Sequence, residues 1–454
     1  MKNSKTIFVL AGAAVGFNSL AALAAEPVSR DEVRAIVSEM LAAAETRSSL
    51  LAGGGDAGYD KNFFMASADG NYRLNISGYT QFQYIMNFRS TSNTITGYTD
   101  EFNSGFAMRQ AKIRLSGNVV NPDLTFAIEG QFGSGDYYDW WNGEVFGNGA
   151  FTLDDAYVNY NVGNGWSVRG GQYKSYFLKE ENNADVYTMS GQRGMVNAAF
   201  GQGRVQGIGA KYKGENWWVG ADITDGFRTQ NTDFTSFNEA DFAITGRFEY
   251  RFAGTDDQLK DYTSMPGDAM GAMIGAAVHF QLANNDSNYF SADANYLSWT
   301  VDGQIEGSGL SLFGAIVGGH TFFNSASSNP DLSDFGFTVQ GAWRFAANDE
   351  IFLRYDGILL DTDRGFSPDY YSFLTFGYNH YFAGHAAKLT IDCILSLNRT
   401  GGLVDEDSRI VPTGPGSYND FYEPVGILPS NSNGLLGTDK GLEAAVRFQF
   451  QLMF

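Results

Sequence analysis

The sequence ends on LEAAVRFQFQLMF, residues 442–454, in which apolar and polar side chains alternate. Every even position is apolar, and the odd positions include Glu443, Arg447, Gln449 and Gln451. A period of two residues places these two sets on opposite faces of a β-strand. The stretch is slightly longer than the roughly 9–11 residues that a tilted strand needs to cross a bilayer. A soluble β-sandwich can contain such a strand, but the length favours a strand that crosses a membrane.

The composition agrees with a chain of many strands. Aromatic residues make up 15 % of the 454 residues, and 55 glycines accompany only 9 prolines, as expected of strands joined by turns. Beyond the N-terminus no apolar run reaches the ~20 residues of a membrane helix, which excludes a helical membrane protein. The formal charge of −21 argues against nucleic acid as a partner. The terminal Phe454 resembles the aromatic assembly signal at the C-terminus of bacterial outer-membrane barrels.

The N-terminal part differs from the rest of the chain. Residues 1–24 are predicted to be a secretory signal peptide, because a charged start and an apolar run precede the small-x-small site at 22–24. An uncleaved anchor helix is the alternative. Residues 25–52 repeat apolar residues at three- to four-residue spacing, which predicts a short amphipathic or coiled-coil helix. Three copies could bundle in a trimer, whereas a lone helix on the barrel rim or a frayed tail is the alternative. Residues 53–70 are predicted to be a Gly/polar linker.

From residue 71 onward the alternation of the last strand repeats. Sixteen segments show it, which predicts an all-β fold in which residues 71–454 form a 16-stranded antiparallel transmembrane β-barrel. The segments are 71–88, 106–120, 123–134, 151–162, 165–177, 203–214, 215–225, 240–253, 270–283, 290–303, 307–322, 333–347, 349–361, 370–382, 386–398 and 441–454. Short turns and long loops alternate between them, as in outer-membrane barrels, whose short turns face the periplasm. Residues 254–269 are a long exception among the short turns.

Charged residues assign the two faces of each strand. In the eighth segment, Phe248 and Tyr250 alternate with Arg247 and Glu249. Charged groups are costly in the bilayer core, so the second set is expected to point inward. A polar interior on almost every strand predicts a water-filled channel. The third long connection, 178–202, mixes apolar and charged residues, which suits a loop folded into the lumen; an ordinary surface loop is the alternative.

The same parity identifies ionisable side chains that face the predicted channel. The inward bases are Lys112, Arg114, Lys211, Lys213, Arg247, Arg251, Arg344, Arg354 and Arg447, and the third loop adds Lys179 and Arg193. The inward acids are Glu129, Asp222, Asp241, Glu249, Asp293, Asp356, Asp392 and Glu443. The two sets nearly balance, and the ordinary interpretation of any one of these residues is a cross-strand ion pair. The sequence therefore does not predict a strongly anion-selective pore.

No pattern in the sequence indicates an enzyme. Cys393 is the single cysteine, so no intramolecular disulfide can form, and no metal-binding pattern arises from it and four scattered histidines. A Gly-x-Ser-x-Gly elbow is absent, and Gly201-x-Gly203 precedes a strand rather than a helix. A barrel enzyme would need a Ser/His pair in its wall, and the spacing provides no serine partner for the histidines. We expect no catalytic residue, no metal and no cofactor.

Several motifs of the barrel resemble those of the phosphate-selective porin O and P family. They are MRQAKIRLSG (108–117), DAYV (155–158), RGGQYK (169–174), VNAAFGQGR (196–204) and FGYNHYFAGHAAKL (376–389). The resemblance spans most of 71–454 and implies a trimeric 16-stranded barrel, a third loop folded inward, and solutes that pass by diffusion. It also carries over Lys112, Arg114, Lys174 and Arg204 as lumen-lining bases. It carries over no phosphate site, because the third loop offers only Lys179 and Arg193 among its acids.

We therefore expect a passive porin of the outer membrane, a homotrimer that admits small ions and hydrophilic solutes. One alternative is a channel selective for phosphate or another oxyanion. Another is a structural anchor whose N-terminal helix binds a periplasmic or cell-wall partner. The predicted pore-lining residues are Lys112, Arg114, Glu129, Lys174, Arg193, Arg204, Lys211, Lys213, Arg247, Arg251, Arg344, Arg354 and Arg447.

Overall fold

The computed structural model describes most of the residues between Gly55 and Phe454. The described residues are 55–90, 101–132, 138–139, 144–145, 151–236, 239–282, 294–323, 330–364, 369–399, 433–438 and 441–454. The predicted signal peptide, 1–24, and the predicted helix, 25–52, lie outside them. None of the helices in these ranges is long and apolar enough to span a membrane.

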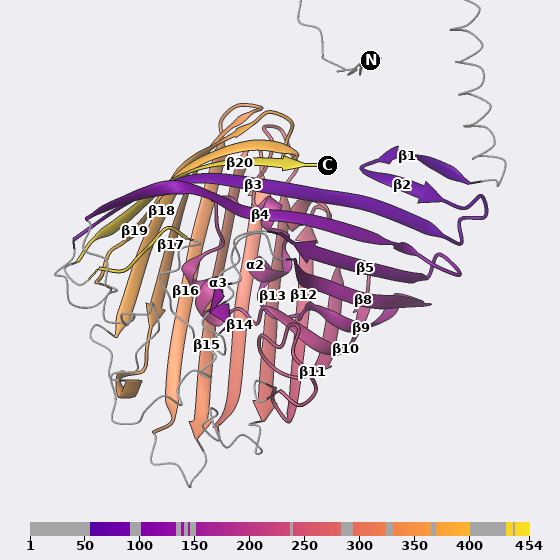
Figure 1. The fold of residues 1–454 in the computed structure, drawn as a ribbon, viewed down its shortest axis with the longest axis horizontal. Coiled ribbons are helices and arrows are strands. Elements are labelled where there is room, and N and C mark those ends of the chain that lie inside the picture. The colour runs from indigo at the N-terminus through magenta and orange to yellow at the C-terminus, as the bar shows by residue number, and fades with distance from the viewer. Residues whose placement is uncertain are drawn as a thin grey trace, which may run out of the picture. The chain divides into compact units, whose positions relative to one another are not determined.

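Sixteen antiparallel strands of the described chain form a closed barrel (Figure 1). They are β3 (Arg73–Arg89), β4 (Phe102–Asn118), β5 (Leu124–Gln131), β8 (Thr152–Gly163), β9 (Trp166–Lys174), β10 (Arg204–Lys213), β11 (Trp217–Thr224), β12 (Phe242–Ala253), β13 (Gly271–Leu282), β14 (Ala294–Gly307), β15 (Leu310–Phe323), β16 (Leu332–Arg344), β17 (Asp349–Leu359), β18 (Tyr370–Tyr381), β19 (Ala387–Ser396) and β20 (Glu443–Met453). Each strand pairs with the next, and β20 pairs back with β3, where Gln451 lies opposite Gln81. The predicted strand number is confirmed, and β12 and β13 pair antiparallel across the long connection 254–269.

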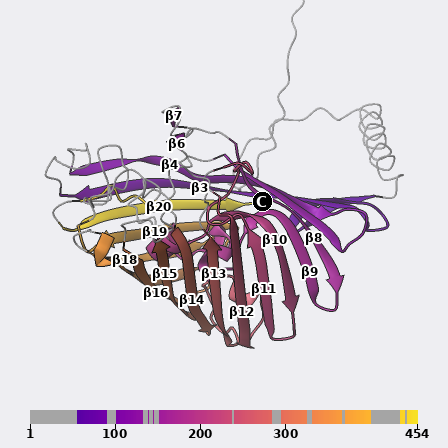
Figure 2. The same cartoon turned by 90° about the horizontal axis from the view of Figure 1, so that it is seen from below.

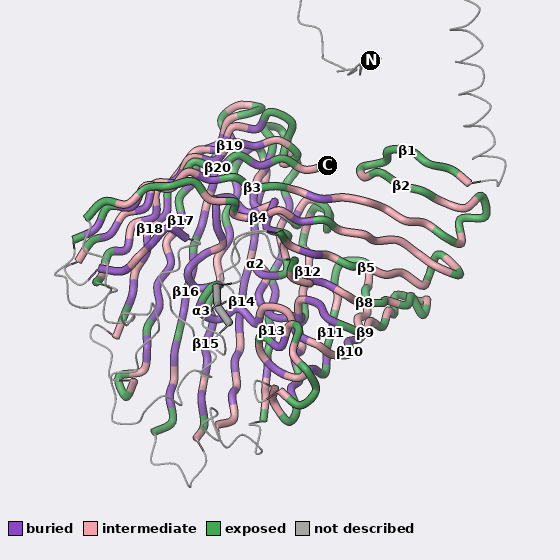
Figure 3. The backbone as a smooth tube through the Cα atoms, in the orientation of Figure 1, coloured by how far each residue is buried: buried purple, intermediate pink, exposed green. Residues whose placement is uncertain are grey.

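The side chains of each strand alternate between the inside and the outside of the barrel. In β20, Arg447 and Gln451 are buried, whereas Phe448 and Phe450 are exposed. Figure 3 shows this alternation of buried and exposed positions along most strands. The exposed apolar side chains form the surface that meets lipid, and the polar set lies inside, as the charge pattern predicted.

Two short hairpins lie outside the barrel wall. β1 (Asp56–Asp60) and β2 (Asn62–Ala66) pair with each other across Lys61, which has a φ of 60°. β2 also pairs with the start of β3. The segment 53–70, which composition predicted to be a linker, therefore contains a hairpin, because the apolar residues of β2 extend the sheet at the edge of β3. The second hairpin joins β6 (Tyr138–Asp139) and β7 (Glu144–Val145).

The third loop, residues 175–203, lies inside the barrel, as predicted (Figures 1 and 2). It contains α2 (Lys179–Asn182), η1 (Asp185–Tyr187) and α3 (Met195–Phe200). α3 packs on β16 and β17, where Phe200 joins a buried apolar cluster with Ile358 and Phe373.

Buried wall residues hold the loop in place. Arg354 Nη1 donates to Ser190 Oγ (2.8 Å) and to the carbonyl of Gln192 (3.1 Å). On the neighbouring side of the barrel, Asp392 accepts the Gly191 N–H (2.8 Å). These contacts join the loop to β17 and β19, on the far side of the lumen from β9 and β10, where the loop begins and ends.

A connection from the opposite barrel end also folds inward. Residues 254–269 contain η2 (Gln258–Lys260), and Tyr262 is buried with its ring 5.0 Å from that of Phe313. Ser311 Oγ donates to the Tyr262 carbonyl (2.5 Å). The Lys260 ammonium lies 5.4 Å from the ring centroid of Tyr187 in the third loop. The third loop is thus supported from the side of the short turns.

Part of the last long connection, 399–440, lies inside the barrel mouth as well. Its described stretch 433–438 buries Leu435 in the apolar cluster of the third loop. Arg447 donates to the Asn433 carbonyl (3.0 Å), and Glu443 accepts the Gly437 N–H (3.0 Å). This part of the connection therefore folds over its own barrel.

The remaining helical turn, η3 (Thr362–Arg364), follows β17.

Candidate functional site

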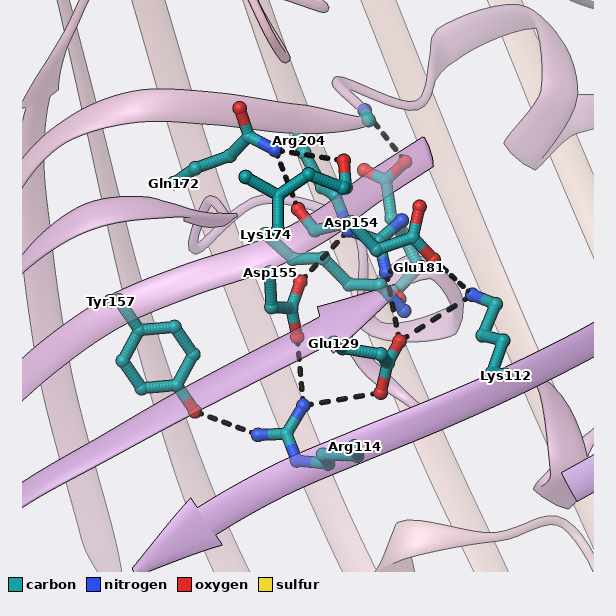
Figure 4. Close-up of polar contacts among 12 residues, drawn as sticks. Lys112, Arg114, Glu129, Asp154, Asp155, Tyr157, Gln172, Lys174, Glu181 and Arg204 are labelled. Carbon is teal, nitrogen blue, oxygen red and sulfur yellow. Dashed lines mark hydrogen bonds and ion pairs between the residues drawn. The ribbon is translucent and has the colours of Figure 1, made fainter. Parts of the chain in front are cut away.

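Beside the third loop, charged side chains of five adjacent strands gather on the inner wall (Figure 4). We call this group the wall cluster. It consists of Lys112, Arg114, Glu129, Asp154, Asp155, Lys174, Asp185, Arg193 and Arg204. The strands are β4, β5, β8, β9 and β10, and the third loop contributes Asp185 and Arg193.

A β-bulge in β8 increases the number of carboxylates in the cluster. Glu129 of β5 lies opposite Asp155, but its neighbour Gly130 lies opposite Leu153, so Asp154 is the extra residue. A bulge lets two consecutive side chains escape the strict alternation of a strand. Asp154 and Asp155 are both buried and both bind bases of the inner wall.

Lys112 lies at the centre of the cluster. Its ammonium is 2.6 Å from Asp154 and 3.4 Å from Asp185. It also lies 3.5 Å from Glu129. The side chain is buried, so these three carboxylates compensate its loss of hydration. Asp185 also accepts the Tyr79 hydroxyl (3.2 Å), which joins the cluster to β3.

Two guanidinium groups share the same carboxylates. Arg204 Nε lies 2.8 Å from Asp155, and Arg114 Nη1 lies 2.9 Å from the other oxygen of that carboxylate. Glu129 lies between the same bases, 3.2 Å from Arg114 and 3.3 Å from Arg204. Arg114 Nη2 also donates to the Tyr157 hydroxyl (3.0 Å). Because each base has several partners, the geometry of the group is fixed.

The third loop is joined to the cluster through Arg193 and Lys174. Arg193 lies 2.5 Å from Asp185 and donates to the Asn183 carbonyl (2.7 Å). Lys174 Nζ donates to the carbonyls of Glu181 (2.9 Å) and Asn183 (3.4 Å). Five bases therefore face four carboxylates. Among the ion-paired side chains of the cluster, Arg114 (29 %) and Arg193 (17 %) are the most exposed, so positive groups dominate the accessible face.

The other predicted lumen bases fall into three groups. Arg247, Arg354 and Arg447 are fully buried, at 2.7, 3.1 and 2.7 Å from the carboxylates of Asp302, Asp356 and Asp392. Lys213 and Arg251 pair with Asp256 near the short turns, and Arg344 donates to the Ala347 carbonyl there. Lys211 lies over the ring of Trp218. Six of the thirteen predicted residues thus meet in the wall cluster.

Sequence parity missed Asp154, Asp155, Asp185, Tyr79 and Tyr157. The bulge residue Asp154 breaks the period of two, and Asp185 comes from a loop whose path parity cannot predict. Of the predicted inward acids, Asp293 lies outside the described residues. Within the described ranges, no three His, Cys, Asp or Glu side chains are grouped as a metal site requires.

A pH effect is expected at the short-turn side, where His385 meets the connection 254–269. Its Nε2 lies 3.3 Å from Asp261. Burial lowers the pKa of His385; a hydrogen bond to Asp261 opposes this, and the charge of Lys388 adds to the lowering. A histidine with a lowered pKa stabilises the folded arrangement fully above its ordinary pKa of about 6.5 and loses that contribution as the pH falls below it.

We therefore expect the single-channel conductance to rise when the pH is lowered from about 7 to about 5, because the connection 254–269 loosens. Single-channel recordings at the two pH values measure the change. His385→Gln cannot take up the proton and should remove most of the difference. An equal rise in that variant would place the titrating group elsewhere.

The sequence and the fold were compared with known protein families and solved structures. Residues 82–391 match the family model of the phosphate-selective porins O and P. No curated protein matches the sequence. Among solved structures, the anion-selective porin from Comamonas acidovorans is 14 % identical, with a TM-score of 0.52, covering 84 % of this chain and 99 % of its own. The channel DcaP of Acinetobacter baumannii is 13 % identical, with a TM-score of 0.50, covering 84 % and 97 %. At these identities the two structures show a common fold.

Proposed function

The chain belongs to the family of phosphate-selective porins O and P and is a passive channel of the outer membrane, and we propose that small hydrophilic solutes cross it with a weak preference for anions. The observation that carries the preference is the unequal exposure of the lumen bases. Arg114 is 29 % exposed at the wall cluster, whereas Arg354 and Arg447 are 2 % and 1 % exposed behind the third loop. An ion that passes the third loop therefore meets the bases of the wall cluster rather than the buried bases of β17 and β20.

A weak preference suits the wall cluster better than phosphate selectivity does. Its most buried base, Lys112, already has three carboxylate neighbours. A phosphate would have to displace them, and breaking a buried pair is costly. The cluster has one more base than acids, and the bases Arg114 and Arg193 lie at its accessible face. Both features bias the local potential toward anions. Phosphate or oxyanion selectivity is the second candidate, and competition by phosphate during anion conduction tests it.

The assembly belongs to the same proposal. We propose a homotrimer of barrels formed by residues 71–454, after removal of a signal peptide at 1–24. The helix at 25–52 bundles in the trimer or binds a periplasmic or cell-wall partner. No enzymatic step and no cofactor are part of the proposal. Deleting 26–52 should leave the conductance of each barrel unchanged and should weaken trimer formation or attachment to the envelope.

The preference can be tested with two opposite substitutions in the wall cluster. Arg114→Gln removes an accessible base, so the reversal potential in a KCl gradient should shift toward cations by a few-fold change in permeability ratio. Glu129→Gln removes a neighbouring acid and should shift it toward anions. Glu129→Gln keeps the size of the side chain and Arg114→Gln shortens it only modestly, so the single-channel conductance should change little.

Lys213→Gln provides a matched control, because this exposed base pairs with Asp256 near the short turns. It should leave the reversal potential close to that of the unsubstituted protein. Shifts of the same sign in the two cluster variants would contradict the proposed role of the cluster.

A further inference from the structure

We propose that the inner wall of β9, β10 and β11 carries a subsite for small carboxylates that bear a flat apolar ring, formed by Arg169, Lys211 and Trp218. The inference rests on the proposed function, because a solute reaches this wall only through the lumen. It adds a class of preferred solute to a channel that otherwise selects by size and charge.

The two bases lie on neighbouring strands and point into the barrel. Arg169 of β9 lies opposite Gly209 of β10, and Lys211 lies opposite Ser167. Arg169 and Lys211 are therefore diagonal neighbours, whose backbones in an antiparallel pair are roughly 7–8 Å apart. Both side chains are partly exposed. This spacing allows one carboxylate to interact with both long side chains.

Aromatic rings hold Arg169 in a defined position. Its guanidinium carbon lies 3.8 Å from the ring centroid of Tyr173 and 4.1 Å from that of Tyr176. Its Nη2 donates to the Lys174 carbonyl (3.0 Å). A guanidinium stacked on rings keeps its N–H groups at the edge, in the plane that a carboxylate approaches. The group is thus oriented for an anion before one arrives.

Lys211 is held in a similar way, by Trp218 of β11. Its ammonium lies 3.8 Å from the centroid of the indole ring. The Trp218 ring is half-buried and lies 5.7 Å from that of Tyr176. Gly220 makes this arrangement possible, because a Cβ there would come within 3.0 Å of the Tyr176 ring and 3.3 Å of the Trp218 ring. The indole is the apolar surface on which a flat ring can stack.

The two nearest acids, Asp222 and Glu249, interact electrostatically with Arg169 and Lys211 but form no close ion pair with them. Asp222 is buried and accepts the Ser175 hydroxyl (3.0 Å). Glu249 lies 3.1 Å from Arg247 and 3.6 Å from Lys179. Within the described chain, neither Arg169 nor Lys211 forms an ion pair, in contrast to the bases of the wall cluster. An organic anion can therefore bind here without breaking an ion pair.

The test uses the whole protein in planar bilayers with benzoate as the probe. Benzoate joins a carboxylate to a flat ring, and acetate has the same carboxylate without the ring. In KCl, millimolar benzoate should lower the single-channel conductance, and acetate at the same concentration should do so about five-fold less. Trp218→Leu should remove this difference, and Arg169→Gln or Lys211→Gln should weaken the benzoate effect about five-fold.

Trp217→Leu is the matched control, because Trp217 immediately precedes Trp218 in β11 and its exposed side chain lies on the outer face. It should keep the response to benzoate. Trp218→Phe retains a ring and should respond between the unsubstituted protein and Trp218→Leu, provided that each variant migrates as a folded barrel on unheated gels.

The outcomes separate this inference from the proposed function. Equal responses to benzoate and acetate, in a channel that conducts and prefers anions, would overturn the subsite and leave the proposed function intact. A full benzoate response in Trp218→Leu would also overturn the subsite and leave the proposed function intact. A protein without conductance would overturn the proposed function itself, and the subsite with it.

Discussion

Replacing residues 176–202 with a four-residue Gly/Ser turn is expected to raise the single-channel conductance several-fold. Lys174 and Arg204 lie opposite each other where β9 ends and β10 begins, so a short hairpin can join the two strands without changing their register. The variant removes the only described segment that crosses the lumen from β9 to β17 and β19. Ion preference should fall at the same time, because Asp185 and Arg193 leave the wall cluster and the remaining charges line a wider path.

The barrel itself should survive this change, since the ladder of sixteen strands is intact. Apolar wall residues such as Ile358 and Phe373 lose their cover, so the thermal stability should decrease. Planar-bilayer recording measures the conductance, and the shift in gel mobility on heating reports folding. An unchanged conductance in a folded barrel would mean that the connection 254–269 or the segment 433–438 limits the flow instead.

Asp392→Ala is expected to be the most destabilising single substitution in the wall. Asp392 accepts two hydrogen bonds from Arg447, at 2.7 and 2.8 Å, and the Gly191 N–H at 2.8 Å. Its removal leaves the fully buried Arg447 guanidinium without a carboxylate, a loss of roughly 3–5 kcal/mol in other proteins. The third loop is released at Gly191 as well. The unfolding temperature should therefore fall, and the open-channel current should become noisier.

The double variant Asp392→Ala/Arg447→Met tests the cause. It removes the stranded cation, so it should recover much of the stability lost by Asp392→Ala alone. Asp256→Ala is the matched control, because its pair with Lys213 is half exposed on both sides and such pairs contribute little. The unfolding temperatures of the three variants test whether the unpaired Arg447 causes the loss of stability. A double variant less stable than the single one would show that Arg447 does not depend on Asp392.

The strands could be predicted from the sequence because lipid and water impose opposite demands on successive residues. Arg447 and Phe448 differ enough in polarity to show their faces without any knowledge of neighbours. The path of the third loop was also predictable in outline, from its position in the order of connections and its resemblance to a known family. The hairpin of β1 and β2 was not, because its few apolar residues were hidden among glycines and polar residues.

The chemistry of the lumen was less predictable, because it depends on distances between strands. Parity placed Arg354 and Arg114 inward alike, yet Arg354 is buried behind the third loop and Arg114 joins the wall cluster. The bulge at Asp154 depends on how β8 pairs with β5, which one strand's sequence does not encode. The inward fold of 254–269 depends on a space that exists only in the closed barrel.

The support of the third loop from both barrel ends has an electrical consequence. Residues 175–203 carry two bases and three acids, a net charge of −1. Moving one charge through the whole transmembrane field changes the energy by about 2.3 kcal/mol per 100 mV. Arg354, Asp392 and the connection 254–269 oppose such a movement together, through several hydrogen bonds and a buried apolar cluster that contains Met189 and Tyr262. At voltages of about 100 mV the loop should therefore stay in place, and the open channel should show a linear current without voltage gating.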